Sequence, residues 1–361
     1  MKKANNRLWD LWQVETALAC NLNCIMCPWV RFRGELKDNG LMDVAVWNAL
    51  APYLDQVGSV DFTGGGEPTL NKNLVEWMKI AGLHGCQTGF LTNGLLLDQA
   101  FSEELIRIGI DWLAVSIDGA DKASYETIRR GADFEKVCRN IKTMSGLRSS
   151  DRPLLMLNFV IMENNSHQLD DIVRLASKLG VDQINFKQCD VIRSDHGQGL
   201  GLFASEESRE VKQHRKRLDR ARKLARKLEL NTTAFSFIPD EQPVCDQNPC
   251  KSMFIGYDGS VSPCINLSMG GPTEFLGAAE IFPTVQYGNV LTDNLNELWE
   301  SEACLEYRNR FHQRSQIRDK VLAGSDIGSS LLSLHRAFQD ATAAMPVAPK
   351  GCRGCHYLYG I

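Results

Sequence analysis

The sequence predicts an α/β fold in which a partial (β/α)6 TIM-like barrel is followed by a small C-terminal domain. From about residue 11 to 190, short apolar runs alternate with amphipathic stretches at helical spacing, which is the rhythm of a parallel sheet. The 361 residues have room for two domains. Most of the cysteines fall into an early and a late group, and the late group indicates a second unit that starts near Cys245.

Six apolar runs are predicted to form the strands of the barrel, and the stretches between them are predicted to form its helices. The strands are expected at residues 12–19, 59–63, 88–91, 112–117, 154–161 and 183–187. Helices are expected at residues 73–84, 102–108, 134–147 and 169–179. In such barrels the chemistry lies on loops that leave the carboxyl ends of the strands, so these loops are where functional residues are sought.

The second half of the chain is predicted to contain a long basic helix and a linker. Residues 205–230 combine helical spacing with many lysines and arginines; they form either a solvated face or a docking surface for an acidic leader, substrate or electron donor. Residues 231–243 are expected to be a linker. The predicted domains are therefore 1–235 and 236–361, with a helical insertion at about 310–350.

Composition narrows the possible partners and the cellular compartment. The net charge is -4 and the pI is near 6.0, which does not favour a general nucleic-acid or membrane-surface binder. No apolar run is long enough for a signal peptide or a membrane span, so a cytoplasmic protein is expected. In that reducing compartment, clustered cysteines indicate metal sites more often than disulfides. Four scattered cysteines are expected to be packing residues: Cys86, Cys138, Cys189 and Cys304.

The early cysteines, Cys20, Cys24 and Cys27, have the spacing C-x3-C-x2-C and directly follow the first predicted strand. Three thiolates on one tight loop suit a cubane iron–sulfur cluster whose fourth iron stays open for another ligand. A zinc site or chance spacing is the alternative for these residues alone. The next predicted strand is followed by a glycine-rich turn, and glycines allow the backbone to approach a ligand closely. Its sequence is Thr63-Gly64-Gly65-Gly66-Glu67-Pro68.

With these two motifs in this order, the chain resembles the radical S-adenosylmethionine (SAM) enzymes. The resemblance implies a [4Fe–4S] cluster on Cys20, Cys24 and Cys27, with the amino and carboxylate groups of SAM on the open iron. It implies that the Gly-Gly-Glu-Pro segment holds the SAM amino group, and that polar residues at later strand ends face SAM or the substrate. The SAM-binding residues implied in this way are Gly65, Gly66, Glu67, Pro68, Asn93, Ser116, Asp118 and Asn158.

The late cysteines are similar to the SPASM/twitch extension of radical SAM enzymes, which holds auxiliary [4Fe–4S] clusters. The resemblance rests on a Gly259-x4-Cys264 unit and a terminal Cys352-x2-Cys355 pair, and it implies one auxiliary cluster, the twitch version. Cys264, Cys352 and Cys355 are the expected ligands, and either Cys245 or Cys250 could be the fourth. A structural zinc knuckle is the alternative.

The resemblance implies an enzyme that generates a 5′-deoxyadenosyl radical and abstracts hydrogen from a peptide, a protein or a small molecule, in a net oxidation or maturation. Reduced flavodoxin or ferredoxin is the expected electron donor. The lack of a recognisable leader-binding domain before the first strand slightly disfavours a leader-dependent peptide substrate. Two alternatives remain: an iron–sulfur electron-transfer protein and a zinc-stabilised scaffold, neither of which turns over SAM.

Overall fold

A computed structural model describes residues 7–34, 36, 38–149, 152–189, 191, 193, 197, 199–202, 209–325 and 331–361. Within them, ten strands form one sheet in the order β12-β9-β8-β1-β2-β3-β4-β5-β6-β7, which is parallel from β8 to β7. A separate hairpin pairs β10 with β11. The strands are β1 (Trp9–Val14), β2 (Val57–Asp61), β3 (Gln87–Thr92), β4 (Trp112–Ser116), β5 (Leu154–Ile161), β6 (Gln183–Gln188), β7 (Asn231–Ala234), β8 (Ser252–Ile255), β9 (Ser260–Ser262), β10 (Gly271–Phe275), β11 (Ala278–Phe282) and β12 (Gly288–Asn289).

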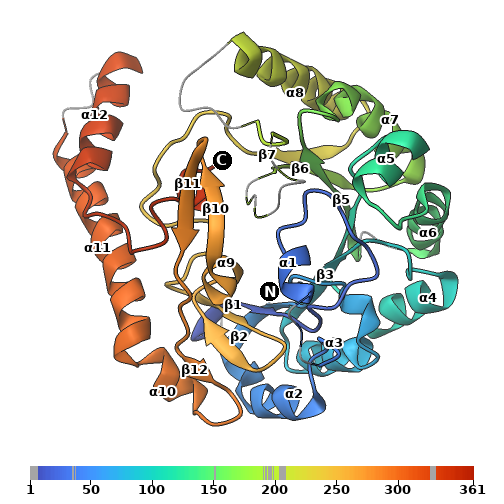
Figure 1. The fold of residues 1–361 in the computed structure, drawn as a ribbon, viewed down its shortest axis with the longest axis horizontal. Helices are drawn as coiled ribbons and strands as arrows, with labels where there is room; N and C mark the ends of the chain where they lie inside the picture. The colour runs from blue at the N-terminus through green and yellow to red at the C-terminus, as the bar shows by residue number, and fades with distance from the viewer. Residues whose placement is uncertain are drawn as a thin grey trace.

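Helices cover the outside of this curved sheet, so the fold is the expected partial TIM-like barrel (Figure 1). Helices α2 to α8 surround one side, and α10 to α12 stand along the opposite side. The helices are α1 (Val30–Arg33), α2 (Val44–Leu50), α3 (Leu74–Leu83), α4 (Gln99–Ile108), α5 (Lys122–Ile128), α6 (Phe134–Leu147), α7 (Leu169–Leu179), α8 (Arg209–Lys227), α9 (Ile265–Met269), α10 (Leu295–Trp299), α11 (Glu302–Gly324) and α12 (Leu331–Ala344).

Local chemistry explains where several barrel helices begin and end. Asp98, Asp121 and Asp133 each accept a hydrogen bond from a backbone N–H of the first turn, which caps α4, α5 and α6. Gly109 and Gly180 adopt left-handed backbone angles directly after α4 and α7, where a side chain would be strained. These signals lie in the sequence itself, and β5, α6 and α7 have the predicted bounds.

The first strand differs from the prediction of residues 12–19. β1 runs from Trp9 to Val14, and residues 15–19 belong to the loop that leads to the cysteines. Glu15, Thr16 and Ala17 are fully buried in that loop. Apolar patterning reports burial, and a buried loop therefore has the same signal as a strand.

The C-terminal half is joined to the barrel more closely than predicted. Part of the expected linker, residues 231–234, is β7, which extends the parallel sheet beyond β6. β8 pairs in parallel with β1, so the segment after residue 250 contributes a strand to the same sheet. The β8–β9–β12 edge then leads to the late cysteines.

The insertion predicted at about 310–350 is helical up to Gly324 in α11 and over Leu331–Ala344 in α12, residues 345–350 are not helical, and residues 326–330 lie outside the described part. Arg314 of α11 is buried and binds the segment before Cys245: it donates to the Pro243 carbonyl at 3.1 Å and to Glu241 Oε1 at 2.7 Å. α11 therefore supports the late cysteine region. Within the described residues, no helix has the length and apolar character needed to cross a membrane.

Candidate functional site

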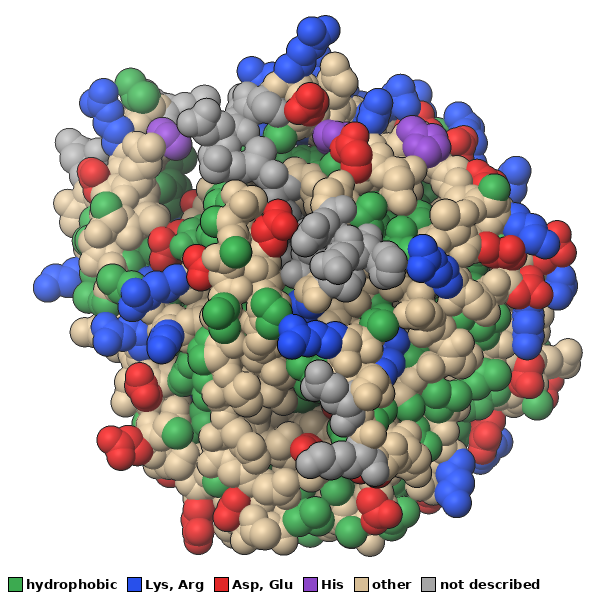
Figure 2. All heavy atoms as spheres, in the orientation of Figure 1, with side chains coloured by type: hydrophobic (Ala, Val, Ile, Leu, Met, Phe, Trp, Pro, Cys, Tyr) green, Lys and Arg blue, Asp and Glu red, His purple; other side chains and the backbone are tan. Residues whose placement is uncertain are grey.

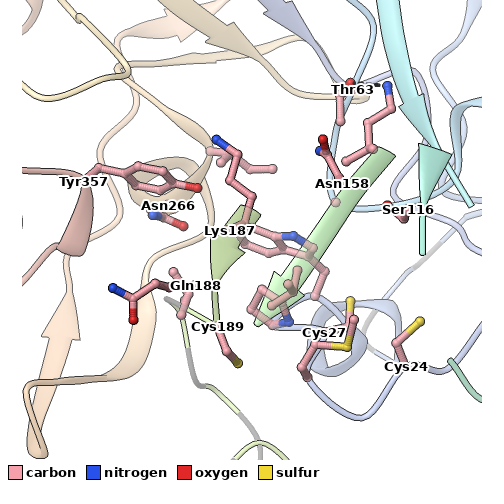
Figure 3. A pocket seen from close by; sticks show the side chains of 18 of the residues that line it. Cys24, Cys27, Thr63, Ser116, Asn158, Lys187, Gln188, Cys189, Asn266 and Tyr357 are labelled. Carbon is pink, nitrogen blue, oxygen red and sulfur yellow. Dashed lines mark hydrogen bonds between the residues drawn. The ribbon is translucent and has the colours of Figure 1, made fainter. Parts of the chain in front are cut away.

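A cavity of about 740 Å³ opens at the carboxyl ends of the barrel strands. The early cysteines line one side together with the glycine-rich turn, Ser116 and Asn158. Lys187 of β6 lies between that side and the opposite wall, where Gln188, Asn266 and Tyr357 are found (Figure 3). The cavity therefore lies between the barrel and the C-terminal segments.

The cysteine loop places three thiols at the cavity, each beside a polar or charged donor. The Arg33 guanidinium donates to Cys27 Sγ at 3.4 Å, Arg129 donates to Cys24 Sγ at 3.9 Å, and the Leu22 N–H donates to Cys20 Sγ at 3.5 Å. Burial raises the pKa of the Cys24 thiol to about 12, although Arg129 acts in the opposite direction. Metal ligation would deprotonate this thiol, and the two guanidiniums would balance the thiolate charge.

The glycine-rich turn packs directly against the cysteine loop. Gly66 donates from its N–H to the Ala17 carbonyl at 3.0 Å, and the Glu67 N–H donates to the Ala19 carbonyl at 2.8 Å. A Cβ on Gly66 would overlap both of these carbonyl oxygens, so only glycine fits. The turn is therefore held at the cavity by its backbone, and Gly64, Gly65 and Gly66 line the cavity.

Glu67 has a different environment from the one expected of a free carboxylate that awaits SAM. Its Oε1 accepts from the hydroxyls of Thr69 and Thr92, both at 2.7 Å, and its Oε2 accepts from the Asn93 N–H at 2.8 Å. The side chain is buried and caps the short helix η2 (Pro68–Leu70). Glu67 thus links the turn to the end of β3 and also lines the cavity, whereas Pro68 begins η2 and does not line it.

The other predicted SAM contacts divide into two groups. Asn93, Ser116 and Asn158 line the cavity, and the Asn93 amide donates to Asn21 Oδ1 of the cysteine loop at 2.7 Å. Asp118 is fully buried and does not line the cavity. Its carboxylate accepts from the Arg129 guanidinium at 2.7 Å and from the Val160 N–H at 2.7 Å. Asp118 therefore positions Arg129 beside Cys24.

The structure also chooses among the late cysteines. Four of them line one narrow cavity: Cys245, Cys264, Cys352 and Cys355. Burial raises the pKa of the Cys245 thiol to about 12, and the neighbouring thiols Cys264, Cys245 and Cys355 add to the effect of burial on the pKa of Cys352. Cys250 is not brought into this group, because its Sγ points to α11 and donates to the Arg308 carbonyl at 3.7 Å.

Several residues at the site were not predicted from the sequence, because they do not belong to a recognisable motif. Glu15 is fully buried and accepts from the Gly65 N–H at 2.7 Å and the Tyr257 N–H at 3.4 Å, so it joins the turn to the C-terminal half. Arg33 also donates to the Gly65 carbonyl at 2.6 Å. Of the four scattered cysteines, Cys189 lines the cavity. The sequence feature that could have indicated Glu15 is a charged residue within an otherwise apolar segment.

Comparison with known proteins places this site in a family. The profile of the radical SAM superfamily matches residues 14–179, and that of the iron–sulfur cluster-binding SPASM domain matches residues 245–320. The chain is similar to the PqqA peptide cyclase of Gluconobacter oxydans, at 26% identity over 76% of this chain and 73% of that one. It is also similar to a tungsten-containing aldehyde ferredoxin oxidoreductase cofactor-modifying protein of Pyrococcus furiosus, at 24% identity over 82% of each chain.

Solved structures share the fold. SuiB of Streptococcus suis bound to S-adenosylmethionine has a TM-score of 0.62 at 14% identity, over 82% of this chain and 67% of that one. The protein anSMEcpe with bound AdoMet has a TM-score of 0.60 at 18% identity, over 83% of each chain. The chain contains a radical SAM domain at residues 14–179 and a SPASM domain at residues 245–320.

The radical SAM domain implies SAM and a [4Fe–4S] cluster, the SPASM domain implies auxiliary iron–sulfur clusters, and the residues present suit them. Each cysteine group supplies the thiols that such clusters require. Within the described chain, no three His, Cys, Asp or Glu side chains converge as one metal ion would demand. A cubane cluster differs in this respect, because its thiolates bind separate irons.

Proposed function

We propose that this protein is a radical SAM oxidoreductase or maturase that oxidises a peptide, a protein or a small molecule by two electrons. The observation that supports it most is the position of the large cavity between the two cysteine groups. Asn266 and Tyr357 line both this cavity and the narrow one among the late cysteines. A substrate in the large cavity would therefore lie next to both centres.

In this proposal Cys20, Cys24 and Cys27 hold the SAM-binding cluster, and Cys245, Cys264, Cys352 and Cys355 hold one auxiliary cluster. When bound, SAM and its cluster would supply a 5′-deoxyadenosyl radical that abstracts a hydrogen atom from the substrate. The auxiliary cluster would accept the second electron. The protein supplies placement and exclusion of water. SAM is oriented by the backbone of Gly65 and Gly66 and by the polar side chains of Asn93, Ser116 and Asn158.

A peptide is the substrate class that we favour. The name of the related PqqA peptide cyclase supports this choice, and the cavity of about 740 Å³ has room for a side chain beside SAM. Lys187 is exposed and lines the cavity, where its ammonium could receive a carboxylate of the substrate. Reduced flavodoxin or ferredoxin remains the proposed electron donor, and a cytoplasmic location remains a prediction.

The test is product formation under anaerobic conditions. The reconstituted protein is mixed with SAM, dithionite and short peptides encoded beside its gene, and both 5′-deoxyadenosine and the peptide mass are followed. We expect 5′-deoxyadenosine in all mixtures and a loss of two hydrogens from one peptide. A Cys352→Ala/Cys355→Ala variant is the control, because it should still form 5′-deoxyadenosine but no oxidised peptide.

Two outcomes would refute the proposal. A colourless protein with zinc and no SAM cleavage would indicate the scaffold alternative. Clusters without 5′-deoxyadenosine would indicate an electron-transfer protein. If SAM is cleaved but the product arises only from small molecules, the peptide assignment alone is wrong.

A further inference from the structure

Helix α8 carries a dense positive charge that the site described above does not use. Its 19 residues include ten lysines and arginines and two acidic residues, so the helix has a net charge of +8. The whole chain has a net charge of -4, and the rest of it therefore carries -12. Lysines and arginines are prominent at the top of Figure 2, over the place that α8 occupies in Figure 1.

The cations form a continuous stripe on the exposed face of α8. They recur at intervals of three or four residues, which places them on one side of a helix. The stripe consists of exposed residues Arg209, Lys212, Lys216, Arg220, Lys223 and Lys227. From end to end it extends about 27 Å, which is the length of about eight residues of extended chain.

The fold itself does not require this charge. α8 packs onto the barrel through the small or apolar side chains of Val211, Leu218, Ala221 and Ala225. Like charges three or four residues apart destabilise a helix by roughly 0.2–0.5 kcal/mol per pair. Arg220 is paired with Asp170 at 2.7 Å, but within the described part of the chain Lys216, Lys223 and Lys227 have no ion pair.

The first half of α8 lies at the end of the barrel into which the cavity opens. Near the start of α8, His214 contacts Glu163 at 3.3 Å and Arg217 donates to Ser166 at 3.1 Å. Glu163 and Ser166 follow the carboxyl end of β5, which is the end that opens into the cavity. The rest of α8 runs away from the rim and leads back to β7, whose residue Thr233 lines the cavity.

We propose that this stripe, defined by the six residues above, binds an acidic segment of the polypeptide substrate while a neighbouring segment enters the cavity. The proposal rests on the peptide substrate of the proposed function and adds where and how that substrate is held. Charge complementarity selects the partner: a short acidic segment matches the stripe, whereas a long polyanion would extend past the helix onto the rest of a chain whose other residues carry a net charge of -12.

The test measures binding without turnover. A fluorescein-labelled peptide with eight consecutive glutamates is titrated with the reconstituted protein at low salt, and a peptide with eight glutamines is the neutral control. The variant Lys216→Glu/Lys223→Glu/Lys227→Glu should bind the acidic peptide at least tenfold more weakly. Glutamate has nearly the helix propensity of lysine, so α8 should persist.

A matched variant controls for net charge. Lys136→Glu/Arg139→Glu/Lys142→Glu reverses three exposed cations of α6 and should bind the acidic peptide as the unaltered protein does. Raising the salt to about 150 mM, where the Debye length is about 8 Å, should weaken binding to the unaltered protein much more than binding to the α8 variant.

The result that overturns the proposal is equal loss in both variants, or no preference for glutamate over glutamine. If the α8 variant binds the peptide normally but is reduced slowly by flavodoxin, the stripe serves the electron donor and the proposal is wrong. Tighter binding of DNA or of anionic vesicles than of the peptide would also refute it. Failure of the proposed function would appear separately, as peptide binding without any oxidised product.

Discussion

Glu15 should make the stability of this protein fall as the pH rises through neutrality. Burial raises the pKa of its carboxyl from 4.5 to about 7, and the N–H groups of Gly65 and Tyr257 only partly oppose that effect. Between pH 4.5 and about 7 the Glu15 carboxyl is protonated in the folded state and ionised in the unfolded state. The free energy of unfolding therefore decreases as the pH rises. A difference of about 2.5 pH units corresponds to about 3 kcal/mol, present below pH 4.5 and lost above pH 7.

The perturbation is Glu15→Gln, which keeps the size of the side chain and removes the titration. Urea unfolding of the cluster-free, reduced protein at several pH values between about 5 and 8 would give the free energy of unfolding for both proteins. Burial also raises the pKa of Asp61 to about 7, so the variant should keep the part of the pH dependence that Asp61 causes. An Asp61→Asn variant provides the matched comparison.

The free energy of unfolding of the unaltered protein, relative to that of the Glu15→Gln protein, should change by up to about 3 kcal/mol across this pH range. Parallel curves for the two proteins would refute the reasoning, because they would mean that Glu15 has the same pKa in the folded and unfolded states.

Further predictions concern the two cysteine groups and the loops between them. The unaltered protein should bind about eight irons; Cys24→Ala should lose about half and form no 5′-deoxyadenosine, and persistent cleavage would contradict the assignment. Cys352→Ala/Cys355→Ala should make the chain after about residue 245 more sensitive to protease, because ligation helps hold that segment folded; an unchanged digestion pattern would argue against a cluster there. Glu67→Gln should weaken SAM binding at least tenfold and speed hydrogen exchange at Asn93, because a hydrogen bond to a charged group contributes about 1.5–3 kcal/mol; unchanged exchange would exclude the linking role. Arg33→Met should shift the reduction potential of the SAM-binding cluster downward while Arg33→Lys shifts it less, as measured by a redox titration.

Much of the barrel could be predicted because its signals are local. The strand at Leu154–Ile161 alternates buried and half-buried residues, and α6 begins at a capping aspartate, so both have the expected bounds. β7 and β8 could not be predicted in the same way. Each is four residues long, and β8 gains its partner, β1, from about 240 residues earlier in the chain.

At the site, as in the fold, the spacing of residues along the sequence carried information, whereas the surroundings of each side chain depended on the folded structure. Spacing singled out the early and late cysteines that line the two cavities, but it did not predict how the neighbouring carboxylates are used. Glu67 and Asp118 each accept hydrogen bonds from protein donors on both carboxylate oxygens, and only the three-dimensional arrangement shows this. The sequence around Arg33 did not indicate a role for this residue. Its contacts are with the loop that precedes it and with the distant Gly65, and they arise only when the chain is folded. The choice between Cys245 and Cys250 required the position of α11.

The pairing of β1 with β8 has a consequence for how the protein is made. β1 precedes the cysteine loop, yet within the described residues the strand that pairs with its outer edge is formed by residues 252–255. At synthesis rates of about 5–20 residues per second, that edge would stay unpaired for roughly 10–50 s while the rest of the barrel emerges. An unpaired edge strand is a template for association with other chains. A nascent chain, or a fragment cut near residue 235, would therefore expose this unpaired edge next to the thiols that must acquire a cluster.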